Sequence, residues 1–335
     1  MLHKIKRLSM LYSLLSIIAC QGQPNTKTMT NETTNNPLLC NPETGVCEIP
    51  NLQTEETLTL SEQNNTEVVK IIYFTDPICS SCWGIEPQMR KLKLEYNSAI
   101  EIEYRMGGLL PDWSYNSGGI SKPSDVAHHW DEVSIYYDMP IDGDIWLEDP
   151  LDSSYPPSIA FKAASLQDSD KALLFLRELR EMVFLKKINI AKWKNIVIAA
   201  QKVGLDVKQL KIDFEGKAKI LFQDDLKLAR QYGVRGFPTL FFINNSGNNE
   251  MVYGSQPYTT YEKAITKIHS NISKKAYSKN WEAIFSKFET LTAREFSELT
   301  ETPRNESEAV LHKLVESGVL KQFFTKNGAI WKITQ

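Results

Sequence analysis

Phe74–Gly84 reads Phe-Thr-Asp-Pro-Ile-Cys-Ser-Ser-Cys-Trp-Gly and holds two cysteines, Cys79 and Cys82, three positions apart. It follows a β-branched and aromatic run, Val68–Phe74, which predicts a buried strand. It leads into a helical pattern from Cys79 to Tyr96. Unpaired backbone N–H groups at a helix start favour a thiolate over a thiol. We therefore expect Cys79 to have a lowered pKa and to support thiol–disulfide exchange together with Cys82.

Two other interpretations of this cysteine pair are half of a zinc site and inert structural thiols. A zinc site needs two further ligands at a similar spacing. The remaining cysteines, Cys20, Cys40 and Cys47, lie N-terminal and form no second pair of this spacing, and the histidines are scattered apart from one adjacent pair. We therefore predict redox chemistry, with no metal and no other cofactor.

The composition is that of an ordinary soluble globular protein. The 335 residues are 42% hydrophobic and 24% charged, and this length accommodates two or three domains. The net charge of −3 gives no reason to expect nucleic acid or an anionic membrane surface as the main partner.

Residues 1–19 are predicted to be a signal peptide, because basic residues precede a short apolar run, Leu8–Ala19. This run is too short to span a bilayer as a helix. Ala19 followed by Cys20 resembles a bacterial lipobox, with Ile17 where leucine is usual. The resemblance implies a lipid anchor on Cys20 and an exported lipoprotein facing the periplasm or the cell exterior. The alternative is an ordinary signal peptide, or a short anchor with an incidental cysteine.

Residues 20–65 are expected to form a flexible tether, because they are rich in Asn, Thr, Gln and Glu and poor in large apolar residues. Within the tether, Pro42 and Gly45 favour a turn that would let Cys40 and Cys47 meet. In an oxidising compartment a small structural disulfide is the default expectation. The alternative is a second redox pair that exchanges with the first.

Residues 66–272 alternate between strand and helix patterns, which predicts a layered α/β fold. A second strand is expected at Ile100–Met106 and a late buried strand at Leu240–Ile243, with a hairpin partner at Met251–Tyr253. Between them, residues 109–217 begin as a proline- and glycine-rich loop and continue with helical patterns. We interpret this stretch as an inserted helical subdomain.

Several motifs together resemble the thioredoxin superfamily, and within it the DsbA-like thiol–disulfide oxidoreductases of the FrnE-like branch. The resemblance covers about residues 66–270 and implies a thioredoxin-like fold. It rests on the Cys-x-x-Cys motif at a helix start, Pro87 shortly after it, Gly236-Phe237-Pro238-Thr239 before the late strand, Asp76-Pro77, Cys82-Trp83-Gly84, Met106–Pro111, Ser153-Ser154 and the long helical insertion.

The resemblance implies a role for each matching residue. Cys79 would be the exposed attacking thiol and Cys82 the buried resolving thiol. The Phe237–Pro238 peptide bond would be cis, with the Phe237 backbone pairing with a substrate chain. Trp83, beside Cys82, is a further candidate for substrate contact, with core packing as the alternative.

Two further expectations concern the helix that carries the cysteines. Pro87 would kink this helix, as an interior proline does. The hydroxyl groups of Ser80 and Ser81 would cap it and donate to the thiolate.

Residues 280–335 predict three helices, Trp281–Leu291, Ala293–Thr300 and Pro303–Ser317, followed by a hairpin around Lys326-Asn327-Gly328. This arrangement resembles a winged helix. Basic and acidic residues balance from Lys279 onwards, eight of each, whereas a DNA-reading domain should be basic. We therefore expect a structural or protein-contact role and no nucleic-acid partner.

The predicted function is that of a protein disulfide oxidoreductase or isomerase that exchanges disulfides with protein thiols and with an unidentified redox partner. The alternative is a redox-sensitive protein-binding adaptor of the same fold without turnover. An isomerase of glutathione-linked substrates is a third class, but it usually has serine in place of the first cysteine.

Overall fold

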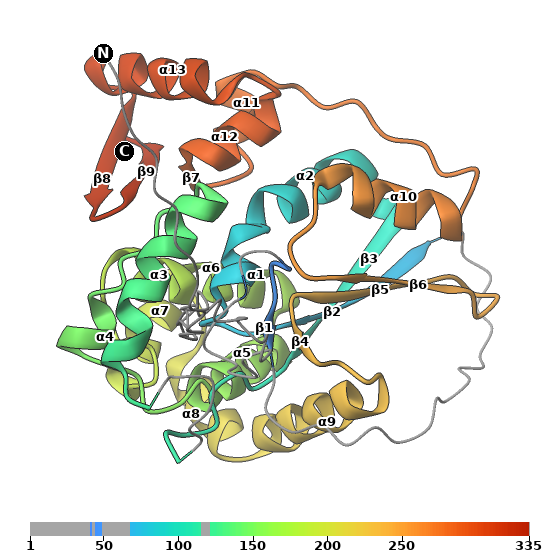
Figure 1. Cartoon of the computed structure of the whole chain (residues 1–335), viewed down its shortest axis with the longest axis vertical. Helices are drawn as coiled ribbons and strands as arrows, with labels where there is room; N and C mark the ends of the chain where they lie inside the picture. The colour runs from blue at the N-terminus through green and yellow to red at the C-terminus, as the bar shows by residue number, and fades with distance from the viewer. Residues whose placement is uncertain (1–40, 42–43, 49–67, 115–120, 335) are drawn as a thin grey trace, which may run out of the picture. The chain divides into compact units, whose positions relative to one another are not determined.

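A four-stranded mixed sheet in the order β3-β2-β5-β6 organises the chain (Figure 1). The computed structural model describes residues 41, 44–48, 68–114 and 121–334, all within one compact unit. Strand β2 (Val69–Thr75) runs parallel to β3 (Ile100–Met106) and antiparallel to β5 (Thr239–Ile243). Strand β6 (Asn249–Tyr253) pairs antiparallel with β5. The sheet therefore contains the strands that the sequence predicted.

Alternating side chains of β2 enter two separate cores, as expected of a strand buried on both faces. Ile71 and Tyr73 belong to the core on one face, and Ile72 and Phe74 to the core on the other. Figure 1 shows helices on both faces of the sheet. Helices α2 (Glu86–Tyr96) and α10 (Tyr258–Ile268) contribute to the first core, and α5 (Tyr155–Gln167) and α9 (Lys217–Gln231) to the second.

The helix that carries the cysteines is broken where Pro87 predicted a kink. Helix α1 (Ser80–Gly84) ends at Gly84, Ile85 caps it, and α2 begins at Glu86 with Pro87 in its first turn. Proline is tolerated there because the first-turn N–H groups have no partner within the helix. A short 3-10 turn, η1 (Asn97–Ala99), then leads into β3.

The stretch between β3 and the late strands is helical, as predicted. Three of its helices, α3, α4 and α8, were not expected. For α3, the proline- and glycine-rich residues around it favoured a loop. Its buried residues, which include Val126, Trp130 and Val133, recur at steps of three and four and are the signal that could have found it. Besides α5 and α9, the helices are α3 (Ser124–Tyr137), α4 (Ile145–Glu148), α6 (Ser169–Leu185), α7 (Trp193–Lys202) and α8 (Val207–Glu215).

The C-terminal region consists of three helices and a three-stranded antiparallel sheet in the order β7-β9-β8. The helices and the hairpin were predicted, whereas β7 was not, because the first helix ends earlier than expected. The winged-helix assignment stays a prediction. The elements are α11 (Trp281–Phe285), β7 (Thr290–Thr292), α12 (Ala293–Thr300), α13 (Arg304–Glu316), β8 (Leu320–Thr325) and β9 (Gly328–Ile333).

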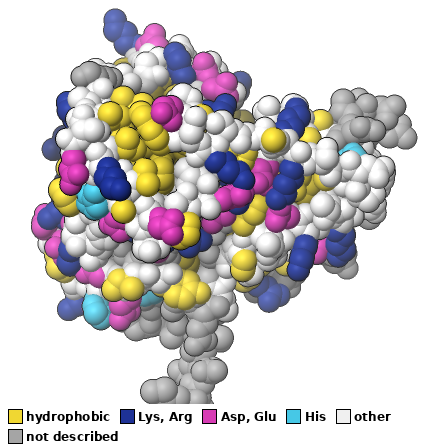
Figure 2. All heavy atoms as spheres, turned by 90° about the horizontal axis from the view of Figure 1, so that it is seen from above, with side chains coloured by type: hydrophobic (Ala, Val, Ile, Leu, Met, Phe, Trp, Pro, Cys, Tyr) yellow, Lys and Arg dark blue, Asp and Glu magenta, His cyan; other side chains and the backbone are white. Residues whose placement is uncertain are grey.

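Two surface properties bear on the partners of the protein. Figure 2 shows Lys and Arg side chains interspersed with Asp and Glu over the described residues of one face, so that face offers no extended area of a single charge. Within the part of the chain that the structure describes, every helix is too short or too polar to cross a bilayer.

Candidate active site

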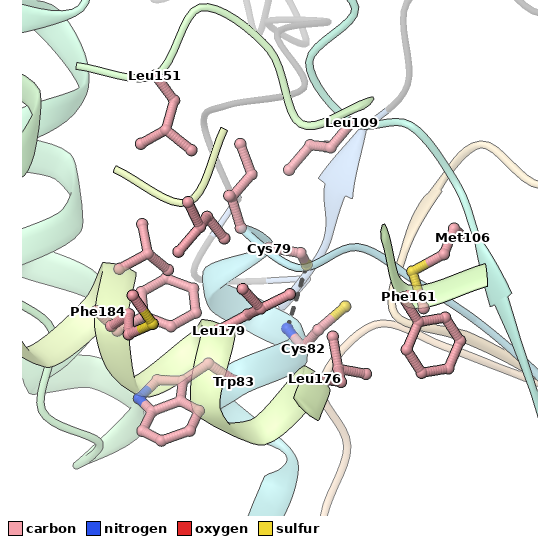
Figure 3. Close-up of a cluster of buried hydrophobic side chains, with 14 of the residues drawn as sticks. Cys79, Cys82, Trp83, Met106, Leu109, Leu151, Phe161, Leu176, Leu179 and Phe184 are labelled. Carbon is pink, nitrogen blue, oxygen red and sulfur yellow. Dashed lines mark hydrogen bonds between the residues drawn. The ribbon is translucent and has the colours of Figure 1, made fainter. Parts of the chain in front are cut away.

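The two cysteines of the motif lie at the start of α1, directly after β2. Cys79 is the N-cap of α1, and its Sγ accepts a hydrogen bond from the backbone N–H of Cys82 at 3.2 Å. Both cysteines are free and fully buried. Figure 3 shows this bond as a dashed line among apolar side chains. The pair is therefore one helical turn apart, as the sequence predicted.

A two-residue strand, β4 (Gly236–Phe237), supplies the other half of the site. The peptide bond that follows, Phe237–Pro238, is cis, which confirms the prediction. Strand β4 pairs antiparallel with β1 (Cys47–Glu48), with Cys47 opposite Phe237. A strand of the same chain therefore lies where the family resemblance places a substrate chain.

Cys47 brings a third sulfur atom to the site. Its Sγ lies 3.3 Å from Cys79 Sγ and 3.4 Å from Ser81 Oγ. Cys47 is disulfide-bonded, whereas Cys79 is a free thiol. The expectation that Cys79 is exposed is wrong for this arrangement, because the Cys47 segment covers it.

Burial changes the ionisation of the two thiols. Removal from water raises the pKa of Cys79 well above its usual value, although the Cys82 N–H favours the thiolate. Burial also opposes ionisation of Cys82, but the Cys79 thiol and the positive charge of Arg180 outweigh it and lower the Cys82 pKa. The predicted lowering of the Cys79 pKa is therefore wrong for the covered site, because desolvation exceeds the effect of the helix start.

Arg180 is a site residue that the sequence reasoning missed. It comes from α6, and its side chain is almost fully buried. Its Nη2 donates to Thr75 Oγ1 at 2.7 Å, and its guanidinium forms an ion pair with Glu86. Its place on the apolar side of the helix, next to Leu179 and one turn before Val183, is the signal that could have found it, since a buried cation requires a partner.

Asp76 holds three parts of the site together. Its carboxylate accepts hydrogen bonds from the N–H groups of Ile78 at 3.0 Å and Leu109 at 2.8 Å, and from the Ser154 hydroxyl at 2.9 Å. These bonds join the turn before the cysteines, the segment after β3 and the start of α5. Burial raises the pKa of Asp76 to about 6, and the hydrogen bonds only partly oppose this. The sequence marked these segments separately, without predicting their contact.

Ser81 takes a different role from the one expected. Its Oγ lies 2.7 Å from the Tyr137 hydroxyl, in addition to its contact with Cys47. The α1 helix is capped by the Cys79 side chain. The capping hydrogen bond that was expected from a serine hydroxyl is therefore made by the cysteine sulfur, because Cys79 and not a serine is the N-cap. Helix α3 supplies Tyr137 and so supports the site.

Trp83 is a core residue, which corrects its candidate role in substrate contact. It is fully buried, and its indole ring stacks on Phe184 with centroids 5.6 Å apart. Its Nε1 donates to the Pro140 carbonyl at 3.0 Å, and the Arg177 guanidinium lies 4.4 Å from the ring centroid. The indole N–H and the ring are thus engaged in core contacts, and Trp83 anchors α1 to the helical part of the domain.

Several predictions fall on residues outside the described part of the chain. These are the signal peptide, the lipidation of Cys20, most of the tether and Cys40, the expected disulfide partner of Cys47. Among the described residues, no group of three or more His, Cys, Asp or Glu side chains is arranged to hold a metal ion.

The fold and the site together define the class of protein. A mixed sheet with a helical insertion, a Cys-x-x-Cys motif at a helix start and a cis-proline loop form a thioredoxin-like domain. The chain belongs to the thioredoxin family, whose sequence profile matches residues 73–263.

Relatives of known name extend over nearly the whole chain. The ClpXP adapter protein SpxH of Halalkalibacterium halodurans is 33% identical over 300 residues, which are 88% of this chain and 96% of the relative. The ClpXP adapter protein SpxH of Bacillus subtilis is 28% identical over 79% of this chain and 89% of the relative. Among solved structures, a candidate protein disulfide isomerase from Nitrosomonas europaea shares the fold with a TM-score of 0.51 and 20% identity, over 61% of this chain and 96% of the other.

Proposed function

We propose that this protein is a thiol–disulfide oxidoreductase that exchanges disulfides with protein substrates through Cys79 and Cys82. The observation that carries the proposal is the free dithiol itself. Cys79 Sγ accepts a hydrogen bond from the Cys82 N–H and contacts Cys47, whose strand pairs with the backbone of β4 immediately before cis-Pro238. A reactive sulfur next to a backbone that holds an extended chain is what exchange with a polypeptide requires.

In the reducing direction, the Cys79 thiolate attacks a substrate disulfide and one substrate sulfur leaves as a thiol. Cys82 then attacks Cys79 Sγ, releases the second substrate thiol and leaves the enzyme disulfide. In the oxidising direction the same bonds form and break in reverse order. The lowered pKa of Cys82 favours its attack as a thiolate on the mixed disulfide.

The proposed location is outside the cytoplasm, with a lipid anchor on Cys20. The support is the sequence alone: a basic start, a short apolar run and a small residue before a cysteine. In such a compartment a disulfide at Cys47 persists, and an exchange enzyme finds substrate disulfides.

A second candidate function is that of a redox-sensitive protein-binding adaptor without turnover. It is favoured by the relatives of the chain, which are named as ClpXP adapter proteins. The C-terminal region offers exposed apolar side chains for a partner: Phe323 is 47% exposed and Phe324 is 71% exposed. In this function the cysteine pair would report the redox state and the C-terminal region would bind the partner.

Reduction of insulin by dithiothreitol, with and without the purified protein, distinguishes the two functions. We expect the wild type to accelerate precipitation of the insulin B chain and the Cys79→Ser variant to lose this acceleration. The Cys82→Ser variant is the matched comparison, because it should form a mixed disulfide with substrate but not release it. Partner binding that persists in Cys79→Ser, together with wild-type protein that leaves the insulin rate unchanged, would establish the adaptor function instead.

A further inference from the structure

The segment 44–48 is held on the domain as a substrate strand would be. Ser255 N–H donates to the Gly45 carbonyl at 2.8 Å, and β1 pairs with β4. Val46 and Cys47 are fully buried by this docking. A turn presents Cys47 to the site; the Asn41 N–H donates to the Val46 carbonyl at 2.8 Å and the Gly45 N–H donates to the Asn41 carbonyl at 2.7 Å.

Two glycines make room for the docked segment. A β-carbon on Gly236 would lie 2.4 Å from Val46 Cγ1 and 2.5 Å from the Cys47 carbonyl oxygen. A β-carbon on Gly254 would lie 2.2 Å from the Thr44 carbonyl oxygen. All three distances are far below van der Waals contact, so the domain surface fits this segment closely.

The docking brings a disulfide sulfur to the attacking thiol. Cys79 Sγ and Cys47 Sγ are 3.3 Å apart, within the separation of about 3–3.5 Å that characterises reacting atoms poised for attack. Cys47 is oxidised and Cys79 is reduced, so the two atoms are in the states that exchange needs.

We propose that the Cys47 disulfide is an intramolecular substrate of Cys79, so that the protein carries two redox pairs that exchange with each other. This inference rests on the proposed exchange chemistry of Cys79 and Cys82 and adds its first substrate. The sequence makes Cys40 the expected partner of Cys47.

The exchange proceeds in two balanced steps. Cys79 loses its proton and attacks Cys47 Sγ; the bond between Cys47 and its partner sulfur breaks, and the partner leaves and takes a proton. Cys82 loses its proton and attacks Cys79 Sγ; the bond between Cys79 and Cys47 breaks, and Cys47 leaves as a thiol. The disulfide of Cys47 gains two electrons, and the Cys79–Cys82 pair loses two.

The docked segment and an external substrate compete for β4, because both use the same backbone edge. Reduction of Cys47 removes its disulfide from the site and leaves Cys79–Cys82 oxidised. The Cys47 disulfide thus sets the redox state in which Cys79 and Cys82 meet an external chain.

The first test is a trapping experiment on the full chain. In Cys82→Ser the second step is blocked, so non-reducing peptide mapping should find a peptide that links Cys79 to Cys47. The linked species should be monomeric and independent of protein concentration, and it should be missing in Cys79→Ser/Cys82→Ser. A Cys40→Ser variant that abolishes the link would identify Cys40 as the leaving thiol.

The second test measures the rate at which the Cys47 disulfide is reduced, because at equilibrium this disulfide can be favoured over the trapped Cys79–Cys47 link. Glutathione is added to protein with an oxidised Cys47, and acid-quenched alkylation follows the appearance of the Cys47 thiol. We expect a rate at least tenfold lower in Cys79→Ser, and a similar fall in Gly236→Ala, which displaces the segment without altering any sulfur. Equal rates in all three proteins, with no linked peptide in Cys82→Ser, would overturn the inference.

Insulin reduction by Cys47→Ser separates this inference from the proposed function. This variant lacks the internal disulfide but keeps Cys79 and Cys82, so it should still accelerate insulin reduction. Activity on insulin without internal exchange would leave the proposed function standing and refute the inference. A linked Cys47–Cys79 peptide in a protein inactive on insulin would establish the internal exchange and refute the function on external substrates.

Discussion

At the scale of single residues, the site depends on buried charges as much as on sulfur atoms. Asp76 organises the turn before the cysteines, and the positive charge of Arg180, from a distant helix, helps the Cys79 thiol to lower the pKa of Cys82. Neither residue reacts in the proposed mechanism. Each is buried with hydrogen-bonding partners, which is what makes a charged group tolerable inside a protein.

Asp76 should make the free energy of unfolding depend on pH. The pKa of its carboxyl group is about 6 in the folded protein, against about 3.9 in an unfolded chain. Folding disfavours ionisation of this carboxyl group. Its contribution to the free energy of unfolding is therefore fully present below about pH 4 and is lost as the pH rises through about 6. A shift of about two units corresponds to roughly 3 kcal/mol. Urea titrations of the wild type should show the free energy of unfolding falling by about this amount between pH 4 and pH 7.

The Asp76→Asn variant is the control, because it lacks the titrating group. Its amide cannot accept both the Ile78 and Leu109 N–H groups, which now bond to different carboxylate oxygens. We expect about 1–3 kcal/mol lower stability at pH 4, because one buried donor loses its acceptor. A fall between pH 4 and pH 7 as large as that of the wild type would show that another group is responsible.

At the scale of elements, the cis-proline loop is positioned by its fit against the segment after β3. The ring of Phe237 packs over Gly107, where a β-carbon would lie 1.7 Å from Phe237 Cζ. The Gly107 N–H in turn donates to the Thr75 carbonyl at 2.8 Å, at the end of β2. The two halves of the site, far apart in sequence, are thus held together by one glycine.

Gly107→Ala should therefore disturb the loop. We expect the free energy of unfolding to fall by about 1–3 kcal/mol, as in other overpacked cores, and the insulin rate to fall with it. Adding Phe237→Leu should recover part of the loss, because the smaller side chain vacates the overlapping volume. Urea titrations of the two single variants and the double variant measure this coupling; strictly additive effects would argue against the contact.

The elements that the sequence missed share a physical cause. Helix α3 was predicted as loop, because single prolines and glycines outweighed its apolar periodicity, and the side chains that decide its conformation pack against distant segments. Its residue Trp130 packs against Phe184 of α6, with ring centroids 4.8 Å apart. Tertiary packing of an amphipathic face stabilises such a helix more than its local propensity does.

At the scale of the whole molecule, the C-terminal region is bound to the thioredoxin-like domain by buried ion pairs. Glu295 of α12 has a fully buried side chain and accepts hydrogen bonds from Arg177 of α6 at 2.7 and 3.0 Å. Arg90 of α2 donates to the Thr290 carbonyl at 2.8 Å and lies 3.3 Å from Glu295. The same Arg177 lies over the ring of Trp83, which belongs to α1. The C-terminal region is thus connected to α1 through Arg177.

Glu295→Gln should weaken this connection strongly. Removing one partner of a buried pair leaves the arginines without their carboxylate, and we expect a loss of about 3–5 kcal/mol in the free energy of unfolding. The matched control is Glu308→Gln, because Glu308 pairs with Arg304 at the surface and is 45% exposed. Its cost should be about 1 kcal/mol or less. Similar costs in urea titrations of the two variants would mean that the buried pair does not hold the regions together.

Local sequence determined the cysteine motif and the order of elements. A cysteine pair between a β-branched run and a helical pattern, and a proline before a late strand, are short-range patterns whose conformations follow from the residues themselves. Thr292 and Glu295 form the capping box of α12 for the same reason. These predictions needed no knowledge of distant contacts.

Only the tertiary structure decided what surrounds the reactive sulfur. The burial of Cys79, the raised pKa of its thiol and the sulfur atom of Cys47 beside it all arise from segments that meet through folding. Desolvation and contact between distant segments depend on three-dimensional proximity, which spacing in the sequence does not encode. The sequence identified two cysteine pairs, and the fold places a sulfur of one against a sulfur of the other.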